Sequence, residues 1–295
     1  MRELTIKILI DNQSFNDLES EHGLSLFVET EDALLLCDMG ASGAFLRNAQ
    51  QMGIDLSRVD YAFISHGHSD HTGGLRDFLE RYPDKKIITS KNIFEEFYFS
   101  GRRGYMRAMS TDHSLLNKYK DNFLLIDNQC FSDNCEGRWI SSQIAIVANK
   151  YTTSPTPYGN IYLMKEPSSE VVSYLDADPL HLIPDDFKHE QSLIFLTDKG
   201  LVIVSSCSHC GVINIIKSAV DFTGEKRVYA FVGGLHLIDS PQLDQEVELL
   251  VSELNNLFPN IRIITGHCTS DSAKELLSQK LSGVEFFSAG STIVL

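Results

Sequence analysis

Apolar and polar residues alternate over the first hundred positions in a pattern typical of strands separated by helices. Alternation and β-branched side chains predict strands at residues 6–10, 24–30, 33–37, 59–65 and 85–89. The intervening segments predict helices at residues 41–52 and 74–82 and a short helical segment at 92–97. Gly53 follows the first helix where a positive φ is favoured, and Pro83 stops the second.

The same order returns after Pro184. Residues 192–197 and 201–205 predict a hairpin around Asp198-Lys199-Gly200. Helices are expected at 212–220, 244–258 and 272–281, strands at 227–232 and 261–265, and a final pair of strands at the C-terminus. Between these halves, residues 99–184 form a less regular insert with short strands near 139–148 and 161–164 and a loop at 151–159. We therefore predict an α/β fold in which packed sheets carry helices outside, organised as one domain over residues 1–295.

Composition limits the classes of partner. The 295 residues are 43% hydrophobic and carry 25 Lys+Arg against 40 Asp+Glu, a net charge of −15. This balance disfavours nucleic acid, whose binding needs a cationic surface. The chain has no apolar run long enough to span a membrane and no export signal, and its six cysteines are too few for a disulfide framework. We expect a cytoplasmic protein with a small-molecule substrate; the oligomeric state stays open.

The most specific motif follows the strand predicted at 59–65: Ser65-His66-Gly67-His68-Ser69-Asp70-His71. On extended backbone His66 and His68 point the same way and can share one metal ion. Asp70 and His71 follow a bend and can turn towards a second ion. Imidazole and carboxylate ligands suit Zn²⁺, with iron or manganese as substitutes.

Two later segments place further candidate ligands at strand ends. Cys207 and His209 share one face where the predicted hairpin closes, and His267 follows the strand at 261–265. A ligand on a strand end is held rigidly, as a metal site requires. Cys207 and Cys210 also form a C-x-x-C, which leaves metal ligation by Cys207, a redox pair and simple packing as alternatives.

These motifs together resemble the metallo-β-lactamase superfamily over essentially the whole chain. The resemblance implies a four-layer αββα sandwich with a one- or two-metal site, and it assigns metal-site positions to Asp38, His66, His68, Asp70, His71 and His267. Glu21-His22-Gly23, residues 65–75 and 207–211, Gly233-Gly234-Leu235-His236-Leu237 and Gly266-His267-Cys268-Thr269 resemble one branch of that family. This branch contains metal-dependent hydrolases similar to the methanopterin-pathway enzyme that joins a dihydropterin to a ribofuranosyl-aminobenzene phosphate.

The sequence departs from the superfamily pattern at two positions. Most members carry a metal-bridging Asp at the end of the hairpin, where this chain has Cys207, so the bridge is missing or is a thiolate. The usual third histidine of the first site precedes the hairpin, where His189 stands. The third ligand is therefore His209 or His189, and the branch-like motif favours His209.

Other residues have less definite roles. His22 and His236 are candidates for substrate contacts or proton donors, and structural histidines are the alternative. Arg102, Arg103 and Arg107 are able to clamp a phosphate or carboxylate, but a solvated helix face is the preferred interpretation.

The working hypothesis is hydrolysis by a metal-bound hydroxide of a small ester, lactone, amide or phosphoester, with Asp70 orienting the nucleophile. A second hypothesis, from the branch resemblance, is a transferase joining a dihydropterin diphosphate to an arylamine phosphate. A third is mono-iron sulfur oxygenase chemistry, which bound iron and oxygen consumption would favour.

Overall fold

The computed structural model describes residues 1, 3–127, 137–149, 154–166 and 180–295. Two seven-stranded sheets form its centre. The first sheet has the order β18-β1-β2-β3-β4-β5-β8, with strands Thr292–Val294, Leu4–Ile10, Ser25–Thr30, Leu34–Cys37, Tyr61–Phe63, Ile87–Ser90 and Phe123–Ile126. The second has the order β17-β16-β15-β14-β13-β10-β9, with strands Val284–Phe286, Arg262–Thr265, Val228–Val232, Gly200–Val204, Gln191–Thr197, Ile144–Ala148 and Gly137–Trp139.

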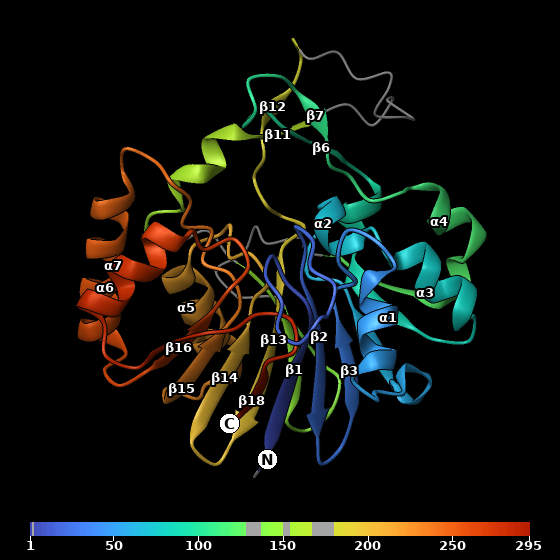
Figure 1. The fold of residues 1–295 in the computed structure, drawn as a ribbon, viewed down its shortest axis with the longest axis horizontal. Helices are drawn as coiled ribbons and strands as arrows, with labels where there is room; N and C mark the ends of the chain where they lie inside the picture. The colour runs from blue at the N-terminus through green and yellow to red at the C-terminus, as the bar shows by residue number, and fades with distance from the viewer. Residues whose placement is uncertain (2, 128–136, 150–153, 167–179) are drawn as a thin grey trace.

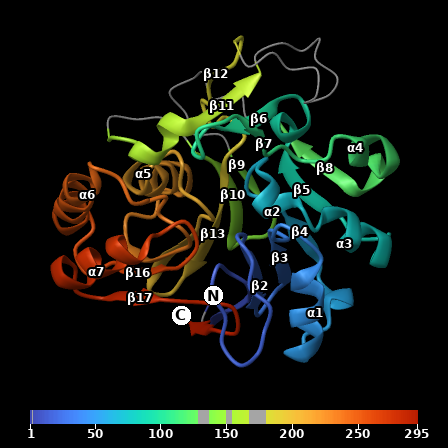
Figure 2. The ribbon, with the colours of Figure 1, turned by 45° about the horizontal axis from the view of Figure 1, so that its top comes forward.

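Helices cover the outer faces of both sheets (Figures 1 and 2). On the first sheet lie α1 (Ala44–Gln51), α3 (Leu75–Arg81) and α4 (Ser114–Lys118), and on the second lie α5 (Val212–Thr223), α6 (Leu243–Leu257) and α7 (Asp271–Lys280). Short 3₁₀ helices span Leu56–Arg58, Lys91–Phe94, Lys120–Asn122 and Tyr158–Tyr162. The predicted four-layer αββα sandwich is confirmed.

Alternation along the strands explains the layers, because successive side chains of a strand point to opposite faces. Leu193 and Phe195 of β13 enter the apolar core between the sheets, whereas Ile194 packs towards the helices of the second sheet. In β3, Leu35 faces the central core and Leu36 faces α1 and α3. Each sheet is therefore apolar on both faces and needs both the other sheet and its helices to exclude water.

Local signals fix several helix ends. The Ser270 hydroxyl caps α7 by accepting a hydrogen bond from the Ala273 amide at 3.2 Å. Gly224 ends α5 with a φ of 74°, in the left-handed region that glycine tolerates best. Among the described residues, no helix is long and apolar enough to cross a membrane.

A third, four-stranded sheet lies across the top of the sandwich in Figure 1. Its order is β12-β11-β6-β7, with strands Ile183–Pro184, Leu163–Glu166, Phe97–Ser100 and Arg107–Ala108. Apart from Phe97 and Tyr98 at the start of β6, this small sheet is built from the insert predicted at 99–184. Residues 128–136, 150–153 and 167–179 of the insert, including the start of the loop expected at 151–159, lie outside the described residues.

Two local predictions are wrong. The helical segment expected at 92–97 ends at Phe94, because residues from Phe97 onward pair with β11. The two C-terminal strands do not pair with each other: β17 joins β16 and β18 joins β1, which places the two termini side by side. A short apolar segment does not indicate which distant strand it pairs with, so the sequence pattern predicted these strands but not their pairing.

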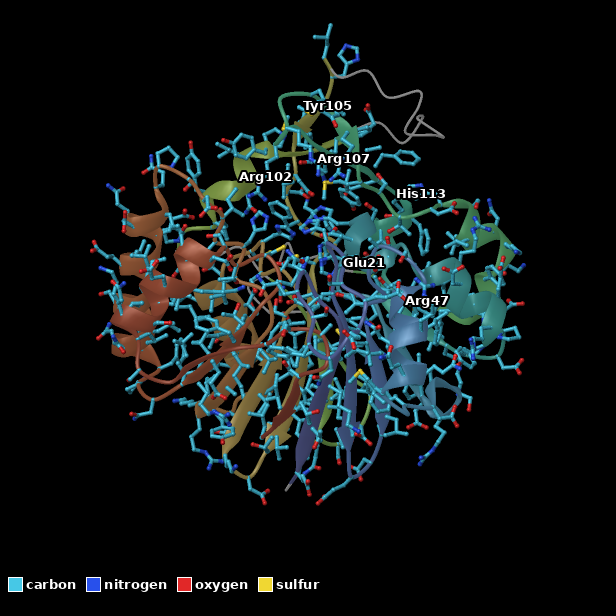
Figure 3. The ribbon with its side chains drawn as sticks, in the orientation of Figure 1. Glu21, Arg47, Arg102, Tyr105, Arg107 and His113 are labelled. Carbon is cyan, nitrogen blue, oxygen red and sulfur yellow. The ribbon has the colours of Figure 1, made fainter. Side chains whose placement is uncertain are left out.

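The helix predicted at Arg102, Arg103 and Arg107 is also wrong, whereas the predicted exposure of these three side chains to solvent is confirmed. Residues 101–106 form the turn between β6 and β7, in which Ser100 pairs with Arg107. Gly104 has a φ of 81°, which a helix does not accommodate. Figure 3 shows Arg102, Tyr105 and Arg107 on this hairpin at the top of the molecule. That the chain forms one domain stays a prediction.

Candidate metal centre

The predicted ligands come together at one edge of the two sheets. They lie on the loops that follow β4, β14 and β16, and the loop after β15 adds His236. Strands β14, β15 and β16 are parallel, so their carboxyl ends meet at the same edge. The short helix α2 (Ser69–Thr72) carries Asp70 and His71 to this edge from the first sheet.

His66, His68 and His209 form the first of two ligand groups. Their ligand atoms lie within 4.8 Å of one another, and all three side chains are buried. The Nε2 atom of each ring is buried and makes no hydrogen bond. The Nδ1 atom of His66 contacts the Ser65 hydroxyl at 2.8 Å. Of the three, only His68 Nε2 has an ion-pair contact, with Asp185 Oδ2 at 3.5 Å. Three buried nitrogens that converge without hydrogen bonds are a donor set for a metal ion, and a held Nδ1 fixes the ring orientation such a site needs.

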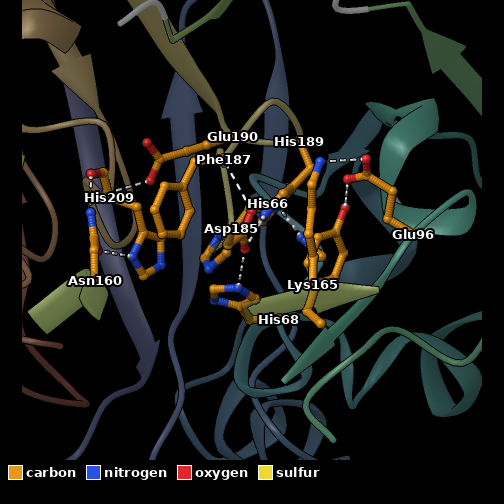
Figure 4. Close-up of polar contacts among 12 residues, drawn as sticks. His66, His68, Glu96, Asn160, Lys165, Asp185, Phe187, His189, Glu190 and His209 are labelled. Atoms are coloured by element: carbon orange, nitrogen blue, oxygen red, sulfur yellow. Dashed lines mark hydrogen bonds and ion pairs between the residues drawn. The ribbon is translucent and has the colours of Figure 1, made fainter. Parts of the chain in front are cut away.

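Buried partners hold His209 in place. The Glu190 carboxylate accepts hydrogen bonds from the backbone amides of His209 at 2.7 Å and Cys210 at 2.9 Å (Figure 4). Phe187 stacks on the His209 ring with centroids 4.7 Å apart, and Asn160 Oδ1 lies 3.3 Å from its Nδ1. The loop after β14 is therefore tied to the chain just before β13.

Asp70, His71 and His267 form the second group. The His71 and His267 Nε2 atoms lie 3.2 Å apart, and Asp70 Oδ2 lies 3.6 Å and 3.5 Å from them. Ligands of one tetrahedral zinc ion lie about 3.3 Å apart, given bonds of about 2.0–2.1 Å. The Nδ1 atoms are held at 2.8 Å by Asp38 on His71 and by Asn12 on His267. This arrangement fits a second ion.

Cys207 lies between the two groups. Its Sγ is 3.1 Å from His71 Nε2, and the thiol clusters both with His66 and His71 and with His267 and Cys268. Cys268 Sγ is 3.3 Å from Cys207 Sγ. The site thus holds a second thiol that the sequence analysis did not select; its place directly after His267 was the available signal.

His189 occupies a different position from His209. Its Nδ1 accepts a hydrogen bond from the Gly67 amide at 3.0 Å, and its Nε2 lies 3.1 Å from Asp185 Oδ2 (Figure 4). Both ring nitrogens therefore have protein partners, in contrast to the free Nε2 of His209. Asp185 Oδ2 also lies 3.5 Å from His68 Nε2, so Asp185, His68 and His189 are a further group able to hold a metal. The contrast in partners favours His209 as the third ligand of the first group.

His22 and His236 border the same site. His22 Nε2 lies 3.4 Å from Asp70 Oδ2 on a side chain that is 58% exposed. His236 is buried, with its ring centroid 4.3 Å from that of His209 and a φ of 49°. Both line a pocket of about 730 Å³ whose walls also include Asp70, Cys207 and His209. These two histidines are thus placed to face a bound small molecule.

Burial controls the protonation of the centre. Burial lowers the pKa of His66, His68 and His209, so the three rings stay neutral, the form that binds a metal. Burial opposes the charged form of Asp70, but His71 and His267 hold its pKa well below the usual range. Within the thiol pair, burial raises the pKa of Cys207, and the hydrogen bond from Cys207 lowers that of Cys268.

We predict a pH-dependent loss of stability caused by His236. Burial lowers its pKa to about 4. The unfolded chain takes up this proton below about pH 6.5, whereas the folded protein does not until about pH 4. This group should therefore lower the free energy of unfolding by about 2 kcal/mol between pH 7 and pH 5. His236→Asn, which tolerates the positive φ, should remove that decrease.

Urea unfolding of chelator-treated wild type and His236→Asn at both pH values measures this effect. The free energy of unfolding of the variant minus that of wild type should be about 2 kcal/mol higher at pH 5 than at pH 7. An equal change in the free energy of unfolding between pH 7 and pH 5 in wild type and variant would contradict the role given to His236.

Comparison with known proteins identifies the family. The model of the metallo-beta-lactamase superfamily matches residues 20–209, more than half of the chain. The chain belongs to this superfamily. A solved structure described as a metal-dependent hydrolase of the beta-lactamase superfamily is 27% identical, with a TM-score of 0.76 and coverage of 98% of both chains. The metallo-beta-lactamase fold protein YhfI of Bacillus subtilis shares the fold at 12% identity, with a TM-score of 0.56 and full coverage of both chains.

Two archaeal superfamily relatives resemble most of the chain. The 7,8-dihydropterin-6-methyl-4-(beta-D-ribofuranosyl)-aminobenzene-5'-phosphate synthase of Methanocaldococcus jannaschii is 27% identical over 88% of this chain and 85% of its own length. An uncharacterized protein of the same organism is 25% identical over 93% of this chain and 94% of its own length. The similarity to the synthase agrees with the resemblance seen in the sequence motifs.

Proposed function

We propose that the chain is a metal-dependent hydrolase that acts on a small ester, lactone, amide or phosphoester. The observation that carries this proposal is the pair of adjacent ligand groups, His66, His68 and His209 beside Asp70, His71 and His267, opening on one pocket. Such histidine and carboxylate sets suit zinc, with iron or manganese as substitutes. When bound, such ions lower the pKa of a coordinated water and polarise the substrate oxygen.

In this proposal each residue around the metal centre has a separate role. Asp38 and Ser65 orient the His71 and His66 rings, and Cys207 supplies a thiol where most of the superfamily has a bridging carboxylate. Asp70, kept ionised by its neighbours, is placed to orient the nucleophile through an accepted hydrogen bond. His236, neutral near pH 7, can donate or accept a proton at the pocket wall, and His22 can contact substrate at the open side.

A screen with chromogenic esters, lactones and phosphodiesters tests the proposed function. Activity should disappear after dialysis against a chelator and return with zinc, iron or manganese. Asp70→Ala should abolish turnover and leave the circular dichroism spectrum unchanged. Turnover that survives both treatments would overturn the proposal.

We predict that Cys207 is a metal ligand and that its replacement is visible in a spectrum. Protein loaded with cobalt(II) should show thiolate-to-metal charge-transfer absorption, because a coordinated thiol is deprotonated. Cys207→Ser should remove at least half of that absorption at unchanged cobalt content. Cys210→Ser is the matched control, a buried cysteine of the same loop, and should leave the band intact. A band that persists in Cys207→Ser would exclude this ligand.

The archaeal synthase supports a second candidate, a transferase that joins a dihydropterin diphosphate to an arylamine phosphate. The match extends over 88% of this chain and 85% of the synthase. This candidate predicts saturable quenching of pterin fluorescence by the protein. Absence of quenching at millimolar pterin would exclude it and leave hydrolysis.

A further inference from the structure

Three arginines of the β6–β7 hairpin face the candidate metal centre from the small sheet. Arg102 and Arg103 lie in the turn and Arg107 begins β7. All three line the pocket of about 730 Å³ that also contains Asp70 and His236. The hairpin and the metal-site loops therefore border one cavity, although these arginines lie 31 or more positions after His71 in the sequence.

None of these three guanidinium groups forms an ion pair with any residue of the described chain. Four other arginines are paired with carboxylates: Arg47 with Glu19, Arg76 with Asp112, Arg227 with Glu225 and Arg262 with Glu285. Arg58, Arg81 and Arg138 form no such pair within the described residues either, but they do not line this pocket. What distinguishes Arg102, Arg103 and Arg107 is that all three line one pocket, in a chain with 40 acidic residues and a net charge of −15. Three unpaired positive charges at one pocket repel each other, and an anion bound among them relieves that repulsion.

The walls around the arginines supply further hydrogen-bond donors. Ser69, Ser100 and Tyr162 line the same pocket. Guanidinium groups bind the oxygens of an anion through two parallel hydrogen bonds, and a phosphate dianion offers more charge and more acceptors than a carboxylate.

We propose that Arg102, Arg103 and Arg107 form a subsite for the phosphate group of a small phosphomonoester. That phosphate is bound by the hairpin and is not itself cleaved. The bond that reacts is another bond of the same molecule and lies at the metal centre. The second part of this statement rests on the proposed function; binding of the phosphate to the arginines does not. The pocket size suits one small molecule with a reacting part and a phosphorylated part.

Calorimetric titration of the full-length, zinc-loaded protein tests the subsite, with phenyl phosphate and benzoate as probes. Wild type should bind phenyl phosphate at least tenfold more tightly than benzoate. The triple variant Arg102→Gln, Arg103→Gln, Arg107→Gln should lose at least tenfold in affinity for phenyl phosphate.

A matched variant controls for net charge. It is the exposed triple Arg58→Gln, Arg81→Gln, Lys226→Gln, which changes the charge equally at positions that do not line the pocket. This control should bind phenyl phosphate within twofold of wild type. Equal losses in both triple variants, or no loss in the pocket variant, would overturn the subsite. Benzoate binding as tight as phenyl phosphate binding would overturn the assignment to phosphate.

A third variant separates the arginines from the metal centre. His66→Ala should retain phenyl phosphate affinity within threefold, because the phosphate is held on the hairpin. Loss of binding in His66→Ala alone would place the phosphate on the metal ions and overturn the subsite. Arginine-dependent binding in a protein that holds no metal and hydrolyses nothing would leave the subsite standing and refute the proposed function.

Discussion

Replacing His66 with alanine is expected to lower kcat/KM for hydrolysis by on the order of 10³-fold or more. His66 supplies one of three buried Nε2 atoms without hydrogen bonds in the first ligand group, so its loss leaves that group with two protein ligands. A hydrolytic site keeps three protein ligands and one open position. Steady-state kinetics together with metal content per chain measures the effect, and metal content should fall with activity.

His113→Ala is the matched control for this prediction. His113 is a half-buried histidine that stacks on Phe97 with ring centroids 4.1 Å apart and belongs to none of the ligand groups. Its replacement should leave kcat/KM within about twofold and metal content unchanged. Full activity in His66→Ala, or equal losses in both variants, would contradict the role given to His66.

Replacing Asp38 with alanine is expected to reduce the free energy of unfolding by about 3–5 kcal/mol. This fully buried carboxylate accepts hydrogen bonds from the Ser65 amide at 2.8 Å and the Ser65 hydroxyl at 2.7 Å, and its Oδ2 lies 2.8 Å from His71 Nδ1. Without it the Ser65 amide and His71 Nδ1 lose this buried partner, and the Ser65 hydroxyl keeps only its contact with His66 Nδ1. Because Asp38 also orients His71, metal affinity at the second group should fall about 10–100-fold.

Urea unfolding and competition with a metal chelator measure the two effects of Asp38. Asp38→Asn retains the shape and suits the φ of 59°, so it should cost less stability than alanine while still weakening the metal site. Asp32→Ala, at an exposed position, should change stability by less than about 0.5 kcal/mol. A stability loss in Asp38→Ala no larger than in Asp32→Ala would contradict this account.

Much of the fold could be predicted from the sequence because the apolar or polar character of successive strand residues indicates which faces of each strand are buried. The segment around Leu193 to Phe195 is apolar at successive positions, as a strand buried on both faces requires, and the hairpin turn at Asp198-Lys199-Gly200 marks its end. The motif His66 to His71 could be predicted because its candidate ligands are close in sequence. Their spacing alone indicates that His66 and His68 turn towards one ion and Asp70 and His71 towards a second.

The rest of the site depends on contacts between residues far apart in the chain. The choice between His209 and His189 turns on hydrogen bonds: His189 has the Gly67 amide and Asp185 as partners, whereas His209 Nε2 has none. The nearness of Cys268 to Cys207 likewise exists only in three dimensions. A single sequence records residue types at each position but not which loops the sheets bring together.

The most direct test of the central claim is metal content per chain, measured by mass spectrometry on protein purified without added metal. A two-group centre predicts close to two ions per chain, with zinc as the expected metal and a loss of bound metal in His66→Ala. No bound metal, even after incubation of the folded protein with zinc, iron or manganese, would contradict the account.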